Sequence, residues 1–590
     1  MTRQSSRPTS NTQLRAFLPM SRQEMDARDW EELDILLVSG DAYVDHPAFG
    51  TALIGRCLES KGYRVGIIAQ PAWRDPQSVA TLGCPRLFAG VTAGAMDSML
   101  NLYTANKKRR SEDAYSPAGR NDLRPARATI VYCNLLRQAF PGLPLIIGGI
   151  EASLRRFAHY DYWDDRIRSS ILLDSGADLL VYGMGEMPVL EVARRLSRSG
   201  RKTDLRFIPG TVFAGSESDL PGKEKTIALP SRQEIQSNPE KLVDAAKLTV
   251  AHSNPYSKDY IAQEDGNRLV ISVHPQRPLK TKQLDAIYDL PFTRRAHFSY
   301  KLPIPALETV RFSITVHRGC YGGCTFCALG LHQGKAIQSR SIQSITREIE
   351  RLSTLKGFRG IITDLGGPTA NMYGTGCTEP EQMAKCKRAS CLFPKPCRLL
   401  KSSHESSLCM LKAVRNLDCL KKAFIASGIR YDLALLDPQY IDELASHHVG
   451  GHLSVAPEHC VDRVLSLMGK PAIGVFERFM VDFKKASQRA NKEQYLIPYL
   501  LSGFPGCTNR DMTQVQRYLS EHRMVSQQVQ AFIPTPMTRA TAMFYSGRSL
   551  AGDRIYVART AEARKRQHRH LTTERRSFIR KPRSSHRKRR

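Results

Sequence analysis

Short apolar segments that end in a turn and lead into a helix-like segment recur along most of the chain. The first unit has a strand-like run at 33–38, helical spacing of apolar residues at 51–61, and a second strand-like run at 64–69. Comparable units follow at 129–149 and 177–196. Because parallel strands need a crossover connection, usually a helix, this alternation predicts a doubly wound parallel sheet in an α/β domain at residues 29–214.

The alternation resumes after residue 306. Strand-like runs at 310–316, 360–364, 494–501 and 528–533 lead into turns, and residues 341–355 have helical spacing. Successive βα units of this kind predict a partial TIM-type (β/α) barrel at 306–550, with reacting groups at the carboxyl ends of its strands. The remaining segments are predicted to be a polar lead (1–28), a proline-containing connecting region (215–305) and a basic, disordered tail (551–590).

Composition excludes several classes of protein. Fourteen cysteines in 590 residues are few for a disulfide scaffold, no secretory signal pattern opens the sequence, and the longest apolar runs are only strand-sized. We therefore expect a soluble cytoplasmic protein of several domains, without a membrane partner and with reduced thiols.

The chain is strongly basic. Its formal net charge is +31, and residues 561–590 alone contain 13 Lys or Arg against 2 Asp or Glu. Such an excess favours nucleic-acid or phosphate binding. The tail has few apolar or aromatic residues, which favours a solvated tail over a dedicated nucleic-acid arm.

The most specific motif is a group of three cysteines, Cys320, Cys324 and Cys327, with the spacing C-x3-C-x2-C. Three thiolates can hold a 4Fe-4S cluster and leave one iron open for a further ligand, as catalytic metal sites require. Gly322 and Gly323 can bring backbone N–H groups close to the sulfurs. The alternative is a zinc site, for which His332 is available as a fourth ligand.

A second cysteine group lies in an irregular insertion at 374–400. Its members are Cys377, Cys386, Cys391 and Cys397. Four thiols in one loop can close around an auxiliary iron-sulfur cluster or a zinc ion. The alternative is four unrelated reduced cysteines.

Several further segments have the residue types of ligand-binding turns. They are His332–Lys335, Arg340–Ser341, Asp364–Pro368, Ser427–Asp432, Val455–His459 and Gly503–Gly506. Together with the three-cysteine loop, these segments resemble those of radical S-adenosylmethionine enzymes, and more closely those of the YgiQ-type proteins among them. The resemblance covers most of the chain.

The resemblance implies a 4Fe-4S cluster whose open iron binds S-adenosylmethionine. Reductive cleavage then gives methionine and a 5′-deoxyadenosyl radical that acts on a substrate. Gly366 and Gly367 are expected to contact the methionyl amino group, and Phe326 to pack beside the adenine. The electron is expected from a donor protein such as flavodoxin or ferredoxin.

The same resemblance gives two more residues a role at the ligand. Ser427 and Arg430 could meet the ribose or the carboxylate of S-adenosylmethionine. Arg430 could equally pair with Asp432, and both interpretations stay open.

The turns of the N-terminal domain resemble those of cobalamin-binding domains, especially Gly148–Gly149 and Gly183–Glu186. The lower-ligand pattern of those domains, Asp-x-His-x-x-Gly, is not met, because Asp45 and His46 are adjacent. This makes cobalamin binding doubtful, and we expect His46 to be a loop or core histidine. The segment 151–166, rich in Arg, Tyr, Trp and Asp, fits either polar recognition or a domain interface.

The leading hypothesis is therefore a radical S-adenosylmethionine enzyme. The alternative is a zinc-bearing, basic nucleic-acid-binding protein without radical chemistry. The sequence does not assign a substrate, and an RNA or protein substrate stays open.

Overall fold

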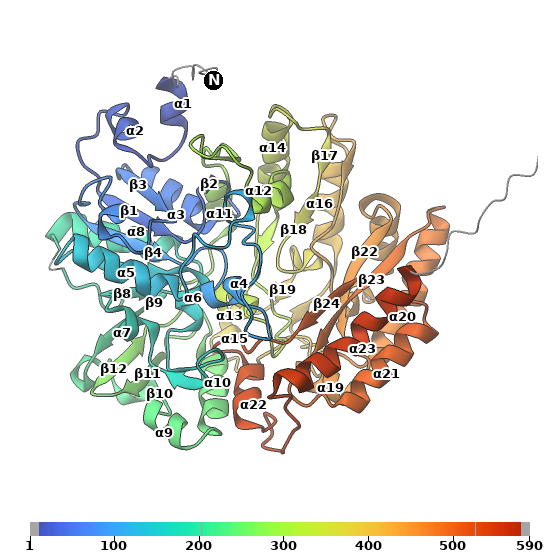
Figure 1. Cartoon of the computed structure of the whole chain (residues 1–590). Helices are drawn as coiled ribbons and strands as arrows, with labels where there is room; N and C mark the ends of the chain where they lie inside the picture. The colour runs from blue at the N-terminus through green and yellow to red at the C-terminus, as the bar shows by residue number, and fades with distance from the viewer. Residues whose placement is uncertain (1–10, 202, 525–526, 580–590) are drawn as a thin grey trace, which may run out of the picture.

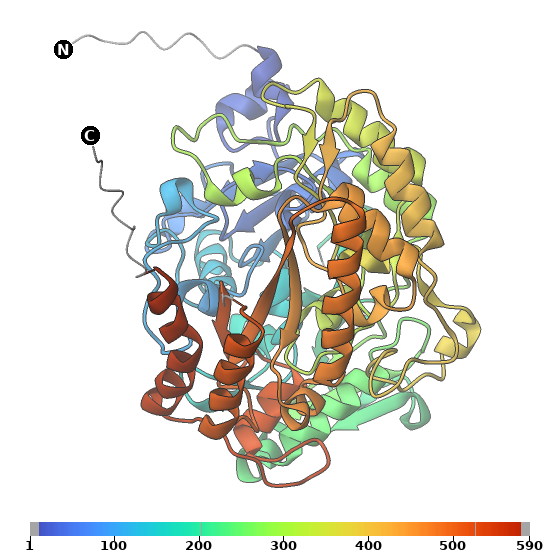
Figure 2. The same cartoon turned by 90° about the vertical axis from the view of Figure 1, so that its right-hand side faces the viewer.

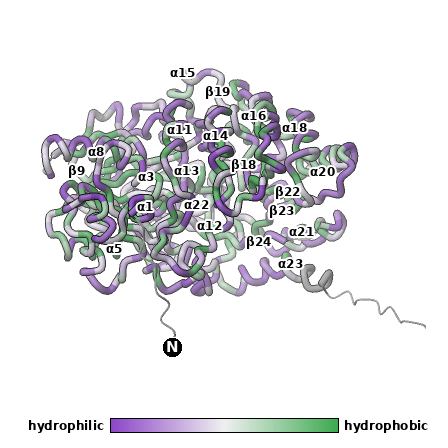
Figure 3. Tube along the Cα trace, turned by 90° about the horizontal axis from the view of Figure 1, so that it is seen from above, coloured by the Kyte–Doolittle hydropathy of each residue, from purple (hydrophilic) through white to green (hydrophobic). Residues whose placement is uncertain are grey.

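The computed structural model describes residues 11–201, 203–524 and 527–579. Two α/β lobes lie side by side, an N-terminal sheet domain and a C-terminal curved sheet surrounded by helices (Figures 1 and 3). This arrangement confirms the predicted fold class, a doubly wound domain followed by a partial (β/α) barrel.

The N-terminal lobe is built on a sheet of nine strands in the order β10-β11-β12-β9-β8-β5-β4-β1-β3. Its parallel part comprises β1 (Ile35–Ser39), β3 (Val65–Ala69), β4 (Phe88–Thr92), β5 (Leu145–Gly148) and β8 (Leu179–Val181). The chain leaves β1 toward β3 on one side and reaches β4 on the other, so the topological switch point lies between β1 and β4. Ligands of such sheets bind beyond the strand ends at this point.

Helices cover both faces of the parallel part. Side chains of α3 (Gly50–Glu59) and α8 (Glu186–Ser199) pack with Leu37 and Ile67 on one face, and those of α5 (Ala128–Ala139) pack with Leu36 and Val38 on the other. All five residues of β1 are buried. Burial on both faces explains why this strand is a continuous apolar run rather than an alternating one.

The prediction of a connecting region at 215–305 is wrong. After β9 (Thr211–Gly215), the strands β10 (Thr226–Leu229), β11 (Tyr260–Asp265) and β12 (Arg268–Ser272) extend the N-terminal sheet. The β11–β12 pair is antiparallel, as are β12 with β9 and β9 with β8. The prolines that suggested a linker lie outside these strands, which are too short to stand out from their flanks in the sequence.

The predicted polar lead is also partly structured. Residues 1–10 lie outside the described part, but α1 (Asn11–Ala16) and α2 (Arg22–Asp26) follow them. Phe17, Leu18 and Met25 are buried against the sheet domain. A few well-spaced apolar residues are enough to fix this segment to the domain.

The C-terminal lobe is a curved set of parallel strands. It includes β14 (Ser313–Thr315), β17 (Ile361–Ile362), β18 (Asp364–Gly366), β21 (Lys422–Ala423), β22 (His452–Glu458), β23 (Tyr495–Ser502) and β24 (Gln528–Ala531). Helices α14 (Ile342–Ser353), α16 (Glu405–Arg415), α20 (Ile473–Arg489) and α21 (Asn509–Glu521) lie outside this sheet (Figure 2). The carboxyl ends of the strands form the rim at which barrel enzymes place reactive groups.

The basic tail is ordered further than predicted. Helix α23 (Ala561–Ile579) lies against α21 and β23. Leu571 is buried, and Gln567 bridges the turn after β23 by accepting from the Gly503 N–H and donating to the Cys507 carbonyl oxygen. The prediction of disorder is therefore wrong for the part of the tail whose side chains are described, which ends at residue 572. The sequence did not reveal this order because a helix held by polar contacts to a turn needs no apolar pattern. Within the described part, no helix is both long and apolar enough to cross a membrane.

Candidate active site

The three-cysteine loop follows β15 (His317–Arg318) at the rim of the barrel. The Cys320 N–H donates to the Gly334 carbonyl oxygen (3.0 Å), and the Thr325 N–H donates to that of Met468 (2.9 Å). Gly323 has φ +63°, and a Cβ there would lie 2.4 Å from the Ala389 carbonyl oxygen. The close approach of two backbone segments therefore requires glycine at this position.

The three cysteines lie together in one pocket of about 130 Å³. Burial, together with the neighbouring Cys324 and Cys320 thiols, raises the pKa of the Cys327 thiol to about 12. Burial likewise raises the pKa of Cys320, which Arg430 and Lys470 oppose. A bound metal centre reverses such shifts, because its positive charge favours the thiolates.

Arg430 supplies positive charge next to this loop. Its Nη1 lies 3.5 Å from Cys324 Sγ, and its Nε and Nη2 bind the Asp432 carboxylate at 2.9 and 2.5 Å. Burial lowers the pKa of Arg430, but Asp432 and the two nearest thiols outweigh it and hold the pKa well above its usual value. The pairing with Asp432 considered from the sequence is thus present.

Gly366 and Gly367 lie at the end of β18, where the chain passes close to other groups. A Cβ at Gly366 would lie 2.3 Å from Asp364 Oδ2 and 2.5 Å from Ser427 Oγ. Asp364 Oδ1 accepts hydrogen bonds from the Ala426 and Ser427 N–H groups. The structure therefore brings Gly366 next to Ser427, two positions in separate segments to which the resemblance gave roles at the same ligand.

Phe326 packs against Phe504. Its ring lies 6.2 Å from that of Phe504 with an interplanar angle of 82°, an edge-to-face contact. Phe504 belongs to the Gly503–Gly506 turn that α23 contacts through Gln567. Phe326, which the resemblance places beside the adenine, therefore contacts the Gly503–Gly506 turn, a second segment on which the resemblance rests.

The cluster loop is joined to the N-terminal lobe by buried polar contacts that sequence reasoning missed. Arg318 forms an ion pair with Glu186 at the start of α8, and each side chain is 3% exposed. His332, considered as a zinc ligand, has its Nδ1 3.0 Å from Ser153 Oγ of the N-terminal lobe. The Gly183–Glu186 turn and the His332–Lys335 segment could be noted in the sequence, but their meeting at this junction could not.

The cysteine-rich insertion folds over the same loop. The Cys391 N–H donates to the Tyr321 carbonyl oxygen (3.0 Å), and Ser390 Oγ donates to that of Gly322 (2.7 Å). Burial raises the pKa of Cys391 to about 11; Lys335 opposes this shift, and Cys386 and Cys397 add to it. The fourth member, Cys377, lies in β19 (Gly376–Cys377), which pairs with β20 (Leu400–Lys401) just after Cys397.

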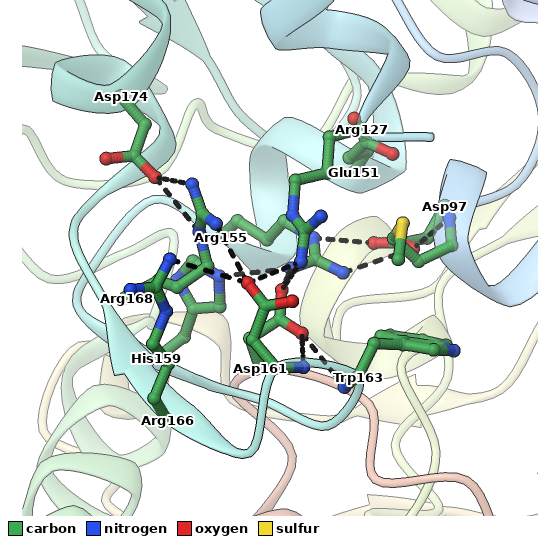
Figure 4. Close-up of polar contacts among 12 residues, drawn as sticks. Asp97, Arg127, Glu151, Arg155, His159, Asp161, Trp163, Arg166, Arg168 and Asp174 are labelled. Atoms are coloured by element: carbon green, nitrogen blue, oxygen red, sulfur yellow. Dashed lines mark hydrogen bonds and ion pairs between the residues drawn. The ribbon is translucent and has the colours of Figure 1, made fainter. Parts of the chain in front are cut away.

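The segment 151–166 forms a buried ion-pair network rather than an open recognition surface. Figure 4 shows Arg155 between Asp97 and Asp161, to which it is linked at 2.8 and 3.5 Å, while Arg127 pairs with Asp161 at 3.0 Å. Burial lowers the pKa of His159 to about 3. The network joins α4 (Ser98–Leu102), α6 (Gly149–Leu154) and the β6–β7 hairpin (His159–Asp161, Arg166–Arg168) within the N-terminal lobe. The interface interpretation is favoured instead by Tyr160 and Tyr162, whose rings lie 6.1 and 6.0 Å from that of Phe544 in the other lobe.

His46 is a core histidine, as predicted. Its side chain is 1% exposed, its Nδ1 accepts from the Ala48 N–H, and its Nε2 lies 3.1 Å from Arg294 Nη1. Asp45 is bound by Arg56. Both members of the incomplete lower-ligand pattern therefore have partners within the protein.

Comparison with known proteins identifies the family. The family profile described as Radical SAM N-terminal matches residues 17–313. A UPF0313 protein of Geobacter sulfurreducens is 47% identical over 569 residues, covering 96% of this chain and 94% of the relative. A UPF0313 protein of Methanosarcina acetivorans is 47% identical over 567 residues, covering 92% of this chain and 76% of the relative.

A solved structure of the radical S-adenosylmethionine methyltransferase TsrM from Kitasatospora setae, with tryptophan and a SAM analogue bound, aligns with 85% of this chain and 74% of its own. Its sequence identity is 16% and the TM-score is 0.49. The match to the relatives extends over almost the whole chain at nearly half identity. The protein therefore belongs to the UPF0313, or YgiQ-type, family of radical S-adenosylmethionine proteins.

Proposed function

We propose that the protein is an enzyme that binds a 4Fe-4S cluster through Cys320, Cys324 and Cys327 and reductively cleaves S-adenosylmethionine. The observation that carries the proposal is the position of these three thiols in one pocket at the barrel rim, with Arg430 3.5 Å from Cys324 Sγ. Bound there, the cluster and S-adenosylmethionine would supply an electron-transfer centre and a source of the 5′-deoxyadenosyl radical.

The residues present fit such a cluster. In a 4Fe-4S cluster each thiolate binds a different iron, so the sulfurs lie farther apart than the ligands of a single zinc ion. A single zinc ion would instead need all of its ligands around one point. Zinc would also need a fourth ligand, and His332 is engaged with Ser153.

The surrounding residues would bind and orient the ligand of the open iron. Gly366 and Gly367 would present backbone groups to its amino group, Ser427 would reach its ribose or carboxylate, and Phe326 would pack by its adenine. The Arg430 guanidinium would offset the charge of the thiolates while Asp432 holds it in place. The buried Arg318–Glu186 pair would fix the loop against the N-terminal lobe and keep water from this side of the site.

The insertion cysteines are proposed as a second metal site, either an auxiliary cluster or zinc. Its support is the proximity of Cys386 and Cys397 to Cys391 and the hydrogen bond from Cys391 to the cluster loop. The reducing electron would come from a flavodoxin or ferredoxin. We further propose a cytoplasmic location, where both the thiols and the cluster stay reduced.

The test is anaerobic reconstitution with iron and sulfide, followed by dithionite and S-adenosylmethionine. The expected result is a brown protein that forms 5′-deoxyadenosine and methionine. A Cys320→Ala/Cys324→Ala/Cys327→Ala variant should form neither product. A colourless zinc protein that produces no 5′-deoxyadenosine would refute the proposal in favour of the zinc-bearing alternative.

A further inference from the structure

A cavity of about 690 Å³ lies between the two lobes. One wall comes from the carboxyl ends of the N-terminal strands, including Ser39, Thr92 and Gly148, and the other from the barrel rim, including Thr315 and Asp364. This volume is within the range of small-molecule sites, about 300–1,000 Å³. Because strand ends of both lobes meet here, the cavity occupies the position at which each fold separately binds ligands.

One buried side chain at this cavity lacks a well-formed hydrogen bond. His317 is 0% exposed to solvent and lines the cavity, and among the described residues neither of its ring nitrogens has a hydrogen-bond partner of ordinary geometry, although the Thr369 backbone lies near enough to influence the ring. A buried polar group left unpaired costs about 1–3 kcal/mol, so native proteins rarely keep one without a use. Burial lowers the pKa of the ring to about 4, against the opposing effect of the Thr369 backbone.

The position of His317 is fixed by the glycine turn of the proposed ligand site. A Cβ at Gly367 would lie 2.5 Å from His317 Cε1 and 2.7 Å from Nε2. The imidazole therefore stacks on the side of Gly367 where any other residue would carry its side chain. At neutral pH the ring is uncharged and offers one N–H donor and one acceptor nitrogen.

The charges around the cavity exclude a polyanion. Among its described lining residues, the only Lys or Arg is Arg318, and its charge is matched by Glu186. Asp41 is paired with Arg124, and Asp364 is met by backbone N–H groups rather than by a cation. Most of the other lining side chains are aliphatic or aromatic, such as Leu37 and Phe49. Nucleic-acid binding needs several cations along the phosphates, which this site lacks.

We propose that the interlobe cavity binds the substrate, that this substrate is a small, largely apolar molecule, and that His317 hydrogen-bonds to its polar group. The inference rests on the proposed function, which puts S-adenosylmethionine at the Gly366–Gly367 edge of the same cavity. It selects a small molecule over the RNA or protein substrate that the sequence left open.

The test uses the full-length reconstituted holoenzyme with dithionite and S-adenosylmethionine. The probes are three fractions of a bacterial extract: organic-soluble small molecules, total RNA and soluble protein. The measured quantity is 5′-deoxyadenosine formed above the level without extract. The small-molecule fraction should raise it in a saturable way, whereas RNA and protein should leave it unchanged.

Variants of His317 then test the contact. His317→Leu removes the hydrogen bond, so the amount of fraction needed for half-maximal stimulation should rise about tenfold, the usual cost of leaving one buried partner unsatisfied. His317→Gln keeps a donor and an acceptor and should restore much of the response. The matched pair is His404→Leu and His404→Gln, because His404 is an equally buried barrel histidine that does not line the cavity. Neither of these should shift the half-maximal amount.

The outcomes separate the two proposals. If wild type forms no 5′-deoxyadenosine in any arm, the proposed function fails and this inference with it. If the product forms but only RNA or protein stimulates it, or no fraction does, the inference alone fails. An equal shift in the His317 and His404 variants would likewise refute the role of His317.

Discussion

Removing the carboxylate of Glu186 should strongly destabilise the junction between the lobes. Glu186 and Arg318 are each 3% exposed, and the Arg318 Nε also donates to the Tyr288 hydroxyl (3.1 Å). In Glu186→Ala the guanidinium stays buried without its counter-charge. Breaking one partner of a buried pair in this way costs about 3–5 kcal/mol.

This cost predicts a change in the temperature of unfolding. A cooperative unit of 150–250 residues loses about 2–4 °C in Tm per kcal/mol, so the variant should unfold roughly 6–20 °C lower. The assay is thermal unfolding of the full chain followed by circular dichroism. The matched control is Asp122→Ala, which breaks an exposed Arg120–Asp122 pair (54% and 59% exposed). Exposed pairs contribute only about 0–1 kcal/mol, so its Tm should fall by a few degrees at most.

A double variant distinguishes two causes of the lost stability in Glu186→Ala: the loss of the ion-pair attraction and the burial of an unpaired Arg318 charge. Glu186→Ala/Arg318→Met removes both charges and should recover much of the lost Tm, because an apolar pair of similar size can replace a buried ion pair. A Glu186→Ala variant that unfolds no earlier than Asp122→Ala would refute the reasoning. So would a double variant that is less stable than the sum of the two single changes.

Three further predictions follow from the site and its surroundings. Gly367→Ala should abolish S-adenosylmethionine cleavage, because the new Cβ would overlap the His317 ring. The control Gly451→Ala should retain cleavage, because nothing lies within 4 Å of its Cβ and its φ is ordinary. Equal activity of the two variants would contradict this prediction. If the insertion holds a second 4Fe-4S cluster, metal analysis should give about eight iron atoms for reconstituted wild type and about four for the Cys320→Ala/Cys324→Ala/Cys327→Ala variant. A triple variant that contains neither iron nor zinc would rule out the second site. Burial lowers the pKa of His404 and His459 to about 4, so the unfolded chain binds more protons than the folded chain between about pH 6.5 and 4. Tm should therefore fall as the pH falls through this window. The His404→Gln variant should show a smaller dependence of Tm on pH, and an unchanged dependence would contradict the assignment.

Local sequence patterns predicted most of the elements that carry the site. The apolar run at 33–38 and the helical spacing at 341–355 correspond to β1 and α14 within a few residues. These predictions succeed because a buried parallel strand and an amphipathic helix leave their periodicity in consecutive residues. The short strands β10–β12 leave too few residues for such a pattern, and the basic segment before residue 573 is held through Gln567 rather than by an apolar stripe.

The candidate site divides in the same way. The cysteine spacing and the glycine turns could be recognised from the sequence, because each consists of neighbouring residues with restricted chemistry. The contacts that these residues make with distant segments could not be recognised from the sequence. Arg318 and Glu186 are 132 positions apart, and Cys391 meets Tyr321 only because the insertion folds back over the loop.

The sequence by itself determined the alternation of strands and helices that marks the two α/β lobes, the three-cysteine loop and the family resemblance. Only the tertiary structure decided that the strand ends of both lobes enclose one cavity, that His317 lines it beside Gly367, and that Arg318, the one Arg or Lys among its described lining residues, is paired with Glu186. The physical reason is distance along the chain: periodicity and motif spacing record interactions between near neighbours. The cavity and its buried charges arise from contacts between segments that only packing brings together.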